Sequence, residues 1–102
     1  MRFLMRVSMP NRDINRSMKE GTFARQMERL LGEVRPEAAY FVTDDGVRTA
    51  YLVVDMQSAH EMPKMAEGFF LAFDAKVDLM PAMVQEDLRK AGPEIDRIAK
   101  AF

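Results

Sequence analysis

The chain has 102 residues, 48% of them hydrophobic and 30% charged, and a formal net charge of −1. This length suits a single domain, residues 1–102, with one hydrophobic core. Acidic and basic residues are interspersed without a basic block, which argues against a nucleic-acid partner, and the absence of cysteine excludes disulfides, thiol catalysis and zinc–thiolate sites.

Residues 3–9 alternate between apolar and more polar side chains, a period of two that predicts a β-strand. Pro10 ends this strand because proline has no N–H to donate to a sheet. Arg6 interrupts the apolar stretch, so it is too short for the core of a signal peptide. No other run reaches the ~20 apolar residues of a membrane helix, and we therefore expect a cytoplasmic protein without a membrane partner.

Residues 13–34 carry apolar side chains at helical spacing. Gly21 weakens the middle of this segment, which leaves open one bent helix or two separate pieces. Pro36 lies just beyond the expected end. The segment is the first main helix of the predicted fold.

Residues 38–43 and 48–56 read as two strands joined by a tight turn. Asp45 and Gly46 provide the positive φ angles that a two-residue hairpin turn requires. The loop lacks the spaced oxygen ligands of a calcium site, so turn chemistry explains its acidic residues. An antiparallel hairpin is the prediction.

The second half of the chain repeats the alternation of helix and strand. Ser58 and Glu61 have the form of a capping box, so a helix begins between Ser58 and Met62 and runs to about Phe73. Residues 76–83 predict a fourth strand, which Pro81 confines to an edge. Residues 85–91 and 93–102 predict two helical pieces, because Gly92-Pro93 stops the first and proline opens the second.

This order of elements predicts an α+β fold of the ferredoxin-like βαββαβ type with an extra C-terminal helix. We expect an antiparallel sheet in which residues 3–9 and 48–56 are adjacent central strands. Both main helices are expected on one face of the sheet. Such a fold hosts many unrelated activities, so function has to be argued from a site.

Seven stretches carry a resemblance to known proteins: residues 19–22, 35–41, 48–51, 54–56, 70–75, 81–83 and 86–88. They resemble a family of small bacterial proteins without an assigned activity. That family is similar to the wider dimeric α+β barrel group, which includes muconolactone isomerases and small cofactor-free monooxygenases. The resemblance implies the fold and a homodimer in which two sheets pair face to face, but it carries over no catalytic residue and implies no cofactor. One departure is Gly68-Phe69, where a larger, partly polar pair is expected.

The sheet face turned away from the helices is the candidate site. Its expected side chains are too apolar for open water and too polar for a plain core, which suits a semi-buried dimer interface around a cavity. In a functional interpretation Arg6 binds an anionic group, Asp55 acts as a base, and Tyr40 and Tyr51 orient a planar ligand. In a structural interpretation, which we favour, these polar groups pair across the dimer seam. The expected members are Leu4, Arg6, Ser8, Tyr40, Val42, Tyr51, Val53 and Asp55.

Other chemistry-bearing residues have simpler explanations. His60 is the only histidine and lacks partners at a metal-ligand spacing, so we expect it on the surface. The pairs Met62/Met65 and Met80/Met83 have a spacing that suits Cu(I), but methionine is an adaptable core residue and packing is the expected role. We expect no metal site and no cofactor.

Two functions remain open from the sequence. The chain is either a small dimeric module that binds an apolar or aromatic molecule in the cavity over the sheet, or a cofactor-independent isomerase or monooxygenase acting in that cavity. An enzyme needs a pocket with convergent groups of shifted pKa, so the geometry of the face has to distinguish the two.

Overall fold

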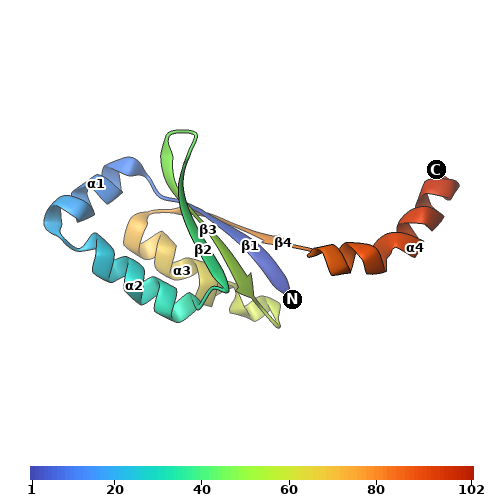
Figure 1. The fold of residues 1–102 in the computed structure, drawn as a ribbon. Helices are drawn as coiled ribbons and strands as arrows, with labels where there is room; N and C mark the ends of the chain where they lie inside the picture. Colours follow the sequence, from blue (N-terminus) through green and yellow to red (C-terminus); the bar gives the residue numbers. More distant parts are fainter.

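The computed structural model describes residues 1–102 and contains one four-stranded antiparallel sheet, four α-helices and a short 3-10 turn. Figure 1 shows the helices α1, α2 and α3 on one side of the sheet and α4 beyond its end. The elements, in chain order, are β1 (Arg2–Ser8), α1 (Asn11–Glu20), α2 (Phe23–Val34), β2 (Ala38–Asp44), β3 (Val47–Asp55), η1 (Ala59–Glu61), α3 (Met62–Phe73), β4 (Lys76–Pro81) and α4 (Gln85–Ala101).

The strand order is β2-β3-β1-β4, and every neighbouring pair is antiparallel. The prediction of an antiparallel sheet with β1 and β3 adjacent at its centre is therefore confirmed. Met5 of β1 lies opposite Leu52 of β3 and Leu79 of β4. Because side chains alternate along a strand, this register places one row of apolar residues on a single face.

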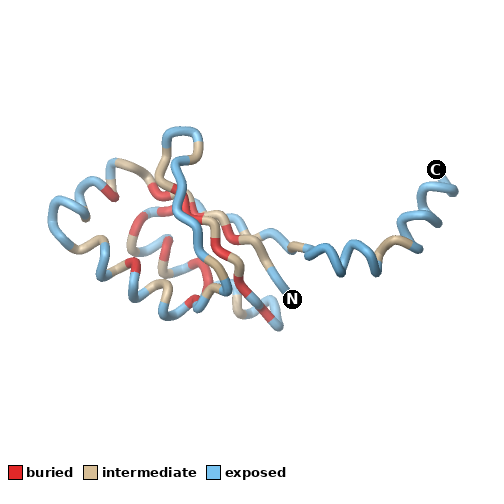
Figure 2. Tube along the Cα trace, in the orientation of Figure 1, coloured by how far each residue is buried: buried red, intermediate tan, exposed pale blue.

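The hydrophobic core lies between that face and the three helices. Met5, Val7, Leu52 and Val54 of the two central strands are fully buried, as their period-two pattern predicts. Figure 2 shows the buried positions concentrated where sheet and helices meet. From the helices, the core takes Ile14 of α1, Met27 and Val34 of α2, and Met65, Phe69 and Phe73 of α3.

The segment 13–34 forms two helices, which decides between the two alternatives left open by the sequence. Gly21 adopts a left-handed conformation with φ of 74° and ends α1, a backbone geometry that glycine accepts without a Cβ clash. A 3-10 turn precedes α3, and the Glu61 carboxylate accepts hydrogen bonds from the backbone N–H groups of Gln57 and Ser58 at 2.7 and 2.9 Å. This glutamate contact is the one that the predicted capping box requires.

The hairpin between β2 and β3 turns at Asp45 and Gly46, whose φ angles are 53° and 76°. Two positive φ angles in a two-residue connection are typical of a type I′ turn, whose twist matches that of the paired strands. The hairpin prediction is confirmed. Its position matters for function because the turn ends β2 at Asp44, on the same face as Tyr40.

The C-terminal segment differs from its prediction. Gln85–Ala101 forms one helix with Pro93 inside it, whereas the sequence predicted two pieces. Proline removes one intrahelical hydrogen bond and crowds the preceding turn, which kinks a helix, and Figure 1 shows α4 bent near its middle. The predicted fourth strand also ends earlier, at Pro81. None of the helices combines the length and the apolar character needed to cross a lipid bilayer.

Candidate functional site

The sheet has a second face that no helix of the chain covers. We call this surface the open face. The register places Tyr40 opposite Tyr51, Tyr51 opposite Arg6, and Arg6 opposite Asp78. A neighbouring row is wholly apolar and runs Ala38, Val53, Leu4 and Met80 across the four strands.

Arg6, Tyr51 and Asp44 form a hydrogen-bonded cluster on the open face. The Tyr51 hydroxyl donates to Asp44 Oδ2 at 2.5 Å. Arg6 Nε donates to both Asp44 Oδ2 and Tyr51 Oη, each at 3.2 Å, and Arg6 Nη2 lies 3.2 Å from Asp44 Oδ2. The side chains of Arg6 and Asp44 are 26% and 34% exposed. All three groups are thus held in one orientation at a partly shielded position.

This cluster shifts the protonation of its carboxylate. The hydrogen bonds from Tyr51 and then Arg6 lower the pKa of Asp44 below its ordinary value, because both stabilise the charged form. The same contacts raise the pKa of Arg6 further. Asp44 therefore stays an anion at neutral pH, and a carboxylate so stabilised is a weak proton acceptor.

Asp55 does not join this cluster within the chain, and pairing across a dimer seam stays a prediction. It lies opposite Arg2 at one end of β3, whereas Asp44 lies opposite Val47 at the other end. Its carboxylate binds the α-amino group of Met1 at 2.7 Å, and this contact lowers the pKa of Asp55. Of the four predicted site residues, the structure groups Arg6, Tyr40 and Tyr51 in one row and leaves Asp55 at the end of the sheet.

Asp44 is the residue that sequence reasoning assigned only to the turn. Its signal was present in the alternation of β2, since Tyr40, Val42 and Asp44 share one face. The long side chains of Arg6 and Tyr51 bridge the distance along the strands to reach it. A carboxylate at the end of a strand can thus pair with a cation two strands away on the same face.

The other candidates of the sequence lie away from the open face. His60 is exposed in η1, and its Nδ1 lies 2.8 Å from Ser58 Oγ. No group of three or more His, Cys, Asp or Glu side chains is arranged to hold a metal ion. Met65 is buried as predicted, whereas Met62, Met80 and Met83 are 45%, 40% and 65% exposed, so the packing prediction is wrong for these three.

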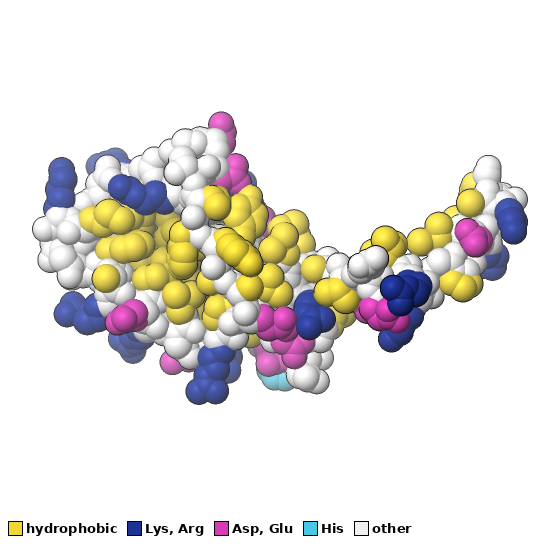
Figure 3. All heavy atoms as spheres, in the orientation of Figure 1, with side chains coloured by type: hydrophobic (Ala, Val, Ile, Leu, Met, Phe, Trp, Pro, Cys, Tyr) yellow, Lys and Arg dark blue, Asp and Glu magenta, His cyan; other side chains and the backbone are white.

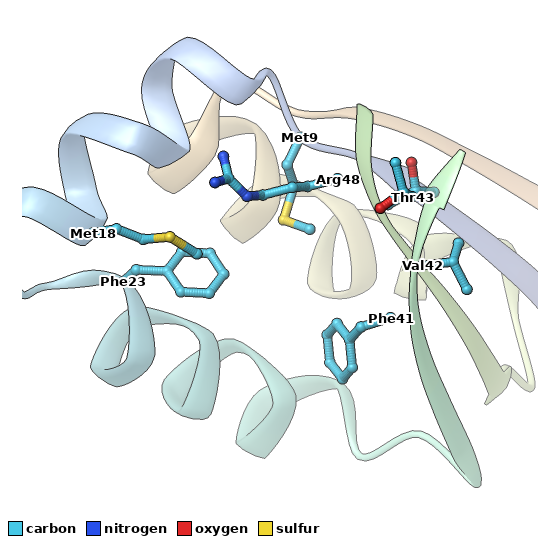
Figure 4. Close-up of a pocket in the computed structure, with 8 residues that line it drawn as sticks. Met9, Met18, Phe23, Phe41, Val42, Thr43 and Arg48 are labelled. Carbon is cyan, nitrogen blue, oxygen red and sulfur yellow. The ribbon is translucent and has the colours of Figure 1, made fainter. Parts of the chain in front are cut away.

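Hollows in the surface occur mainly beside the helices. Five of them, with volumes of about 280 to 540 Å³, are lined by residues other than Arg6, Tyr40, Tyr51 and Asp55. One hollow of about 340 Å³ lies at the β2 edge of the sheet and faces α1 and α2 (Figure 4). We call it the β2 groove. It is lined by Met9, Met18, Phe23, Phe41, Val42, Thr43, Arg48 and Thr49.

Hydrophobic side chains gather visibly around this groove. Figure 3 shows them over α1, α2 and β2, and again along α4. The strand β2 is exposed on both faces, with Tyr40 at 64% on one side and Phe41 at 56% on the other. A strand that is apolar on both faces and open on both is unusual in an isolated molecule.

The open face thus offers aromatic rings, an ordered guanidinium and apolar side chains, but no base of raised pKa. Comparison of the sequence with protein-family models and with curated proteins gives no match. The family resemblance drawn from the sequence therefore stays a prediction.

Proposed function

We propose that the protein is a small homodimeric α+β barrel protein of the ferredoxin-like type that binds a small apolar or aromatic molecule over its open face. The strand order supports this topology, since β1–β2 and β3–β4 are each joined through helices on one face of the sheet. Pairing two copies through their open faces would cover apolar side chains that a single copy leaves in water. The proposal agrees with the resemblance to the dimeric α+β barrel group.

The observation that carries the proposal is the row Tyr40–Tyr51–Arg6 across an uncovered sheet face. Tyrosine rings give flat apolar contact with a polar tip, which suits a planar ligand. Arg6 uses Nε and Nη2 within the cluster. A guanidinium has five N–H donors, so those on Nη1 remain for a polar or anionic group of the ligand.

Binding is favoured over catalysis by the charges on the same face. A cofactor-independent isomerase or monooxygenase needs a proton acceptor whose pKa lies near the working pH. The pKa values of Asp44 and Asp55 are both lowered, by Tyr51 and Arg6 and by the N-terminus respectively. Neither Asp44 nor Asp55 therefore supports the isomerase or monooxygenase alternative.

Fluorescence of 8-anilinonaphthalene-1-sulfonate, an aromatic anion, tests the proposal with two adjacent variants. Tyr40→Ala alters the open face, and Phe41→Ala alters the opposite side of the same strand. We expect a saturable signal with the natural protein, a dissociation constant raised about tenfold or more in Tyr40→Ala through loss of aromatic contact, and little change in Phe41→Ala.

Both variants are compared at a protein concentration at which sedimentation shows each to be dimeric. The reverse pattern, with binding lost only in Phe41→Ala, would place the probe in the β2 groove and refute the proposed site. Absence of any saturable signal would refute binding of this ligand class.

A further inference from the structure

The helix α4 has an apolar side that the rest of the chain leaves uncovered. None of its 17 residues is buried, and Figures 1 and 2 show it extending away from the sheet and helices. The large apolar side chains of α4 and of its two flanking residues, Val84 and Phe102, are between 41% and 103% exposed. They lie on one stripe, because the spacing alternates between four and three residues: Val84, Leu88, Ala91, Ile95, Ile98 and Phe102.

The overall dimensions show that the chain exposes more surface than a compact monomer of its size. The accessible surface is 7248 Å², against about 5,900 Å² for a compact monomer of this mass. The radius of gyration is 16.9 Å, against about 13 Å for a compact chain of this length. The excess surface, about 1,400 Å², exceeds the ~800 Å² that each partner contributes to a stable interface.

We propose that the C-terminal arm, residues 82–102, packs its apolar stripe into the β2 groove of a second copy, and that the two copies exchange arms reciprocally. This inference rests on the homodimer of the proposed function and names the contact that holds it together. Reciprocal exchange gives a closed two-fold dimer, whereas one-way exchange would build an open fibre.

The groove has the chemistry that the arm requires. Figure 4 shows Met18 and Phe23 on one side of the hollow and Phe41 on the other. Arg48 stands at its rim and contacts only the Asn11 carbonyl and Asn15 Oδ1 through its guanidinium, at 3.4 and 2.8 Å. On the arm, Asp87 and Glu94 lie seven residues apart and therefore flank the stripe on the same side. Asp87 Oδ2 accepts a hydrogen bond from the Val84 backbone N–H at 3.0 Å, and Glu94 pairs with Arg97. Both carboxylates still carry the charge opposite to that of Arg48.

Chain geometry favours exchange over folding back. The arm leaves the sheet from β4, and the groove lies beyond β2 at the opposite edge, with α3 and α2 packed on the face between them. The link from Pro81 to α4 is residues 82–84, which span at most about 10 Å. Two sheets packed face to face are also about 10 Å apart, so this link suffices to carry the arm to the level of a partner's sheet.

Matched glutamine variants test the contact by sedimentation of the full chain. Ile95→Gln alters the stripe and Met18→Gln alters the groove, while Lys100→Gln and Lys19→Gln change neighbouring polar positions. We expect the first two to raise the dimer dissociation constant at least about tenfold, because each removes a buried apolar contact. The two lysine variants should stay within about twofold of the natural protein.

Placed cysteines locate the arm directly, since the chain has no cysteine of its own. A Met18→Cys copy is mixed with an isotope-labelled Ile98→Cys copy and oxidised, with Lys100→Cys replacing Ile98→Cys as the control. We expect a mixed disulfide in the first mixture and much less in the second. The double variant Met18→Cys/Ile98→Cys is oxidised in dilute solution. If it forms only an intrachain disulfide, the arm folds back on its own chain and arm exchange is refuted.

The outcomes separate this inference from the proposed function. A dimer that is insensitive to Ile95→Gln and Met18→Gln refutes arm exchange and leaves pairing of the open faces standing. A dimer that depends on these two residues but not on Tyr51 supports arm exchange and refutes pairing through the open face. If the chain is still monomeric at about 100 μM, the dimer affinity is weaker than a specific interface of this size requires. That result refutes both proposals.

Discussion

At the residue scale, Asp44 shows how a turn residue acquires a second role. It ends β2 where the hairpin begins, and it accepts hydrogen bonds from Tyr51 and Arg6. Because these contacts lower its pKa, the folded state releases the proton more readily than the unfolded chain. The cluster thus links the geometry of the open face to pH.

The pH dependence of folding follows from the direction of that shift. The stabilisation by Asp44 is present above the unfolded value, about pH 3.9, and is lost as the pH falls through the lower folded value. We expect urea midpoints of Asp44→Asn to lie below those of the natural protein at pH 7, and the gap to shrink as the pH falls below about 4.

Asp78→Asn is the matched control for this measurement. Asp78 lies opposite Arg6 on β4 but makes no ion pair. A gap for Asp44→Asn that is independent of pH, or an equal pH-dependent gap for Asp78→Asn, would contradict the assigned role of the cluster.

At the element scale, α2 and α3 approach closely where α3 has Gly68. A Cβ at this position would overlap Leu30 Cδ2 of α2. The Gly68-Phe69 pair, noted as a departure in the sequence, is therefore a packing feature: glycine admits Leu30, and Phe69 is fully buried in the core. Gly68 and Leu30 also line one of the surface hollows, of about 460 Å³, between α2 and α3.

Two glycine substitutions measure this close approach. Gly32 lies in α2 with open space around its Cβ position, so Gly32→Ala should raise the free energy of unfolding by roughly 0.5–1 kcal/mol through helix propensity. Gly68→Ala gains the same propensity but forces Leu30 aside, and we expect a net loss of about 1 kcal/mol. Urea unfolding of both variants checks the difference. Equal stabilisation by the two would show that the Leu30 side chain moves aside without cost.

At the scale of the whole molecule, the apolar surface is divided between the open face, the β2 groove and the C-terminal arm. Figure 3 shows the groove and the arm at opposite ends of the same view. The rest of the chain leaves these surfaces uncovered, and both proposals cover them with a second copy. Association would leave the core unchanged while removing the surface excess.

A charge placed at Tyr51 tests whether the open face is the seam. Tyr51→Asp would remove an aromatic ring and place a charged carboxylate in the desolvated seam, so we expect the dimer dissociation constant to rise by about 100-fold or more. Leu71→Asp is the control, since Leu71 on α3 is 85% exposed and belongs to a helix on the opposite side of the sheet. Light scattering across a concentration series compares the two. Equal effects would exclude the open face as the interface.

The sequence by itself determined the elements that depend on local pattern. The alternation of Met5 and Val7, the stripe of Phe69 and Phe73, and the Asp45-Gly46 turn each encode their structure within a few residues, because side-chain period and φ preference are local properties. From these the antiparallel pairing of the sheet and the position of Arg6, Tyr40 and Tyr51 on one face were predicted correctly, whereas Asp44 was left out of that face.

Only the tertiary structure decided which charged side chains form pairs and how the C-terminal arm is arranged. Arg6 pairs with Asp44 because strand register and side-chain length bring them together. Asp55 instead forms an ion pair with the α-amino group of Met1. Glycine and proline at positions 92 and 93 predicted a break, yet the helix continues through them as a bend. Partner choice depends on distances between segments remote in the chain, and a periodic pattern carries no information about those distances.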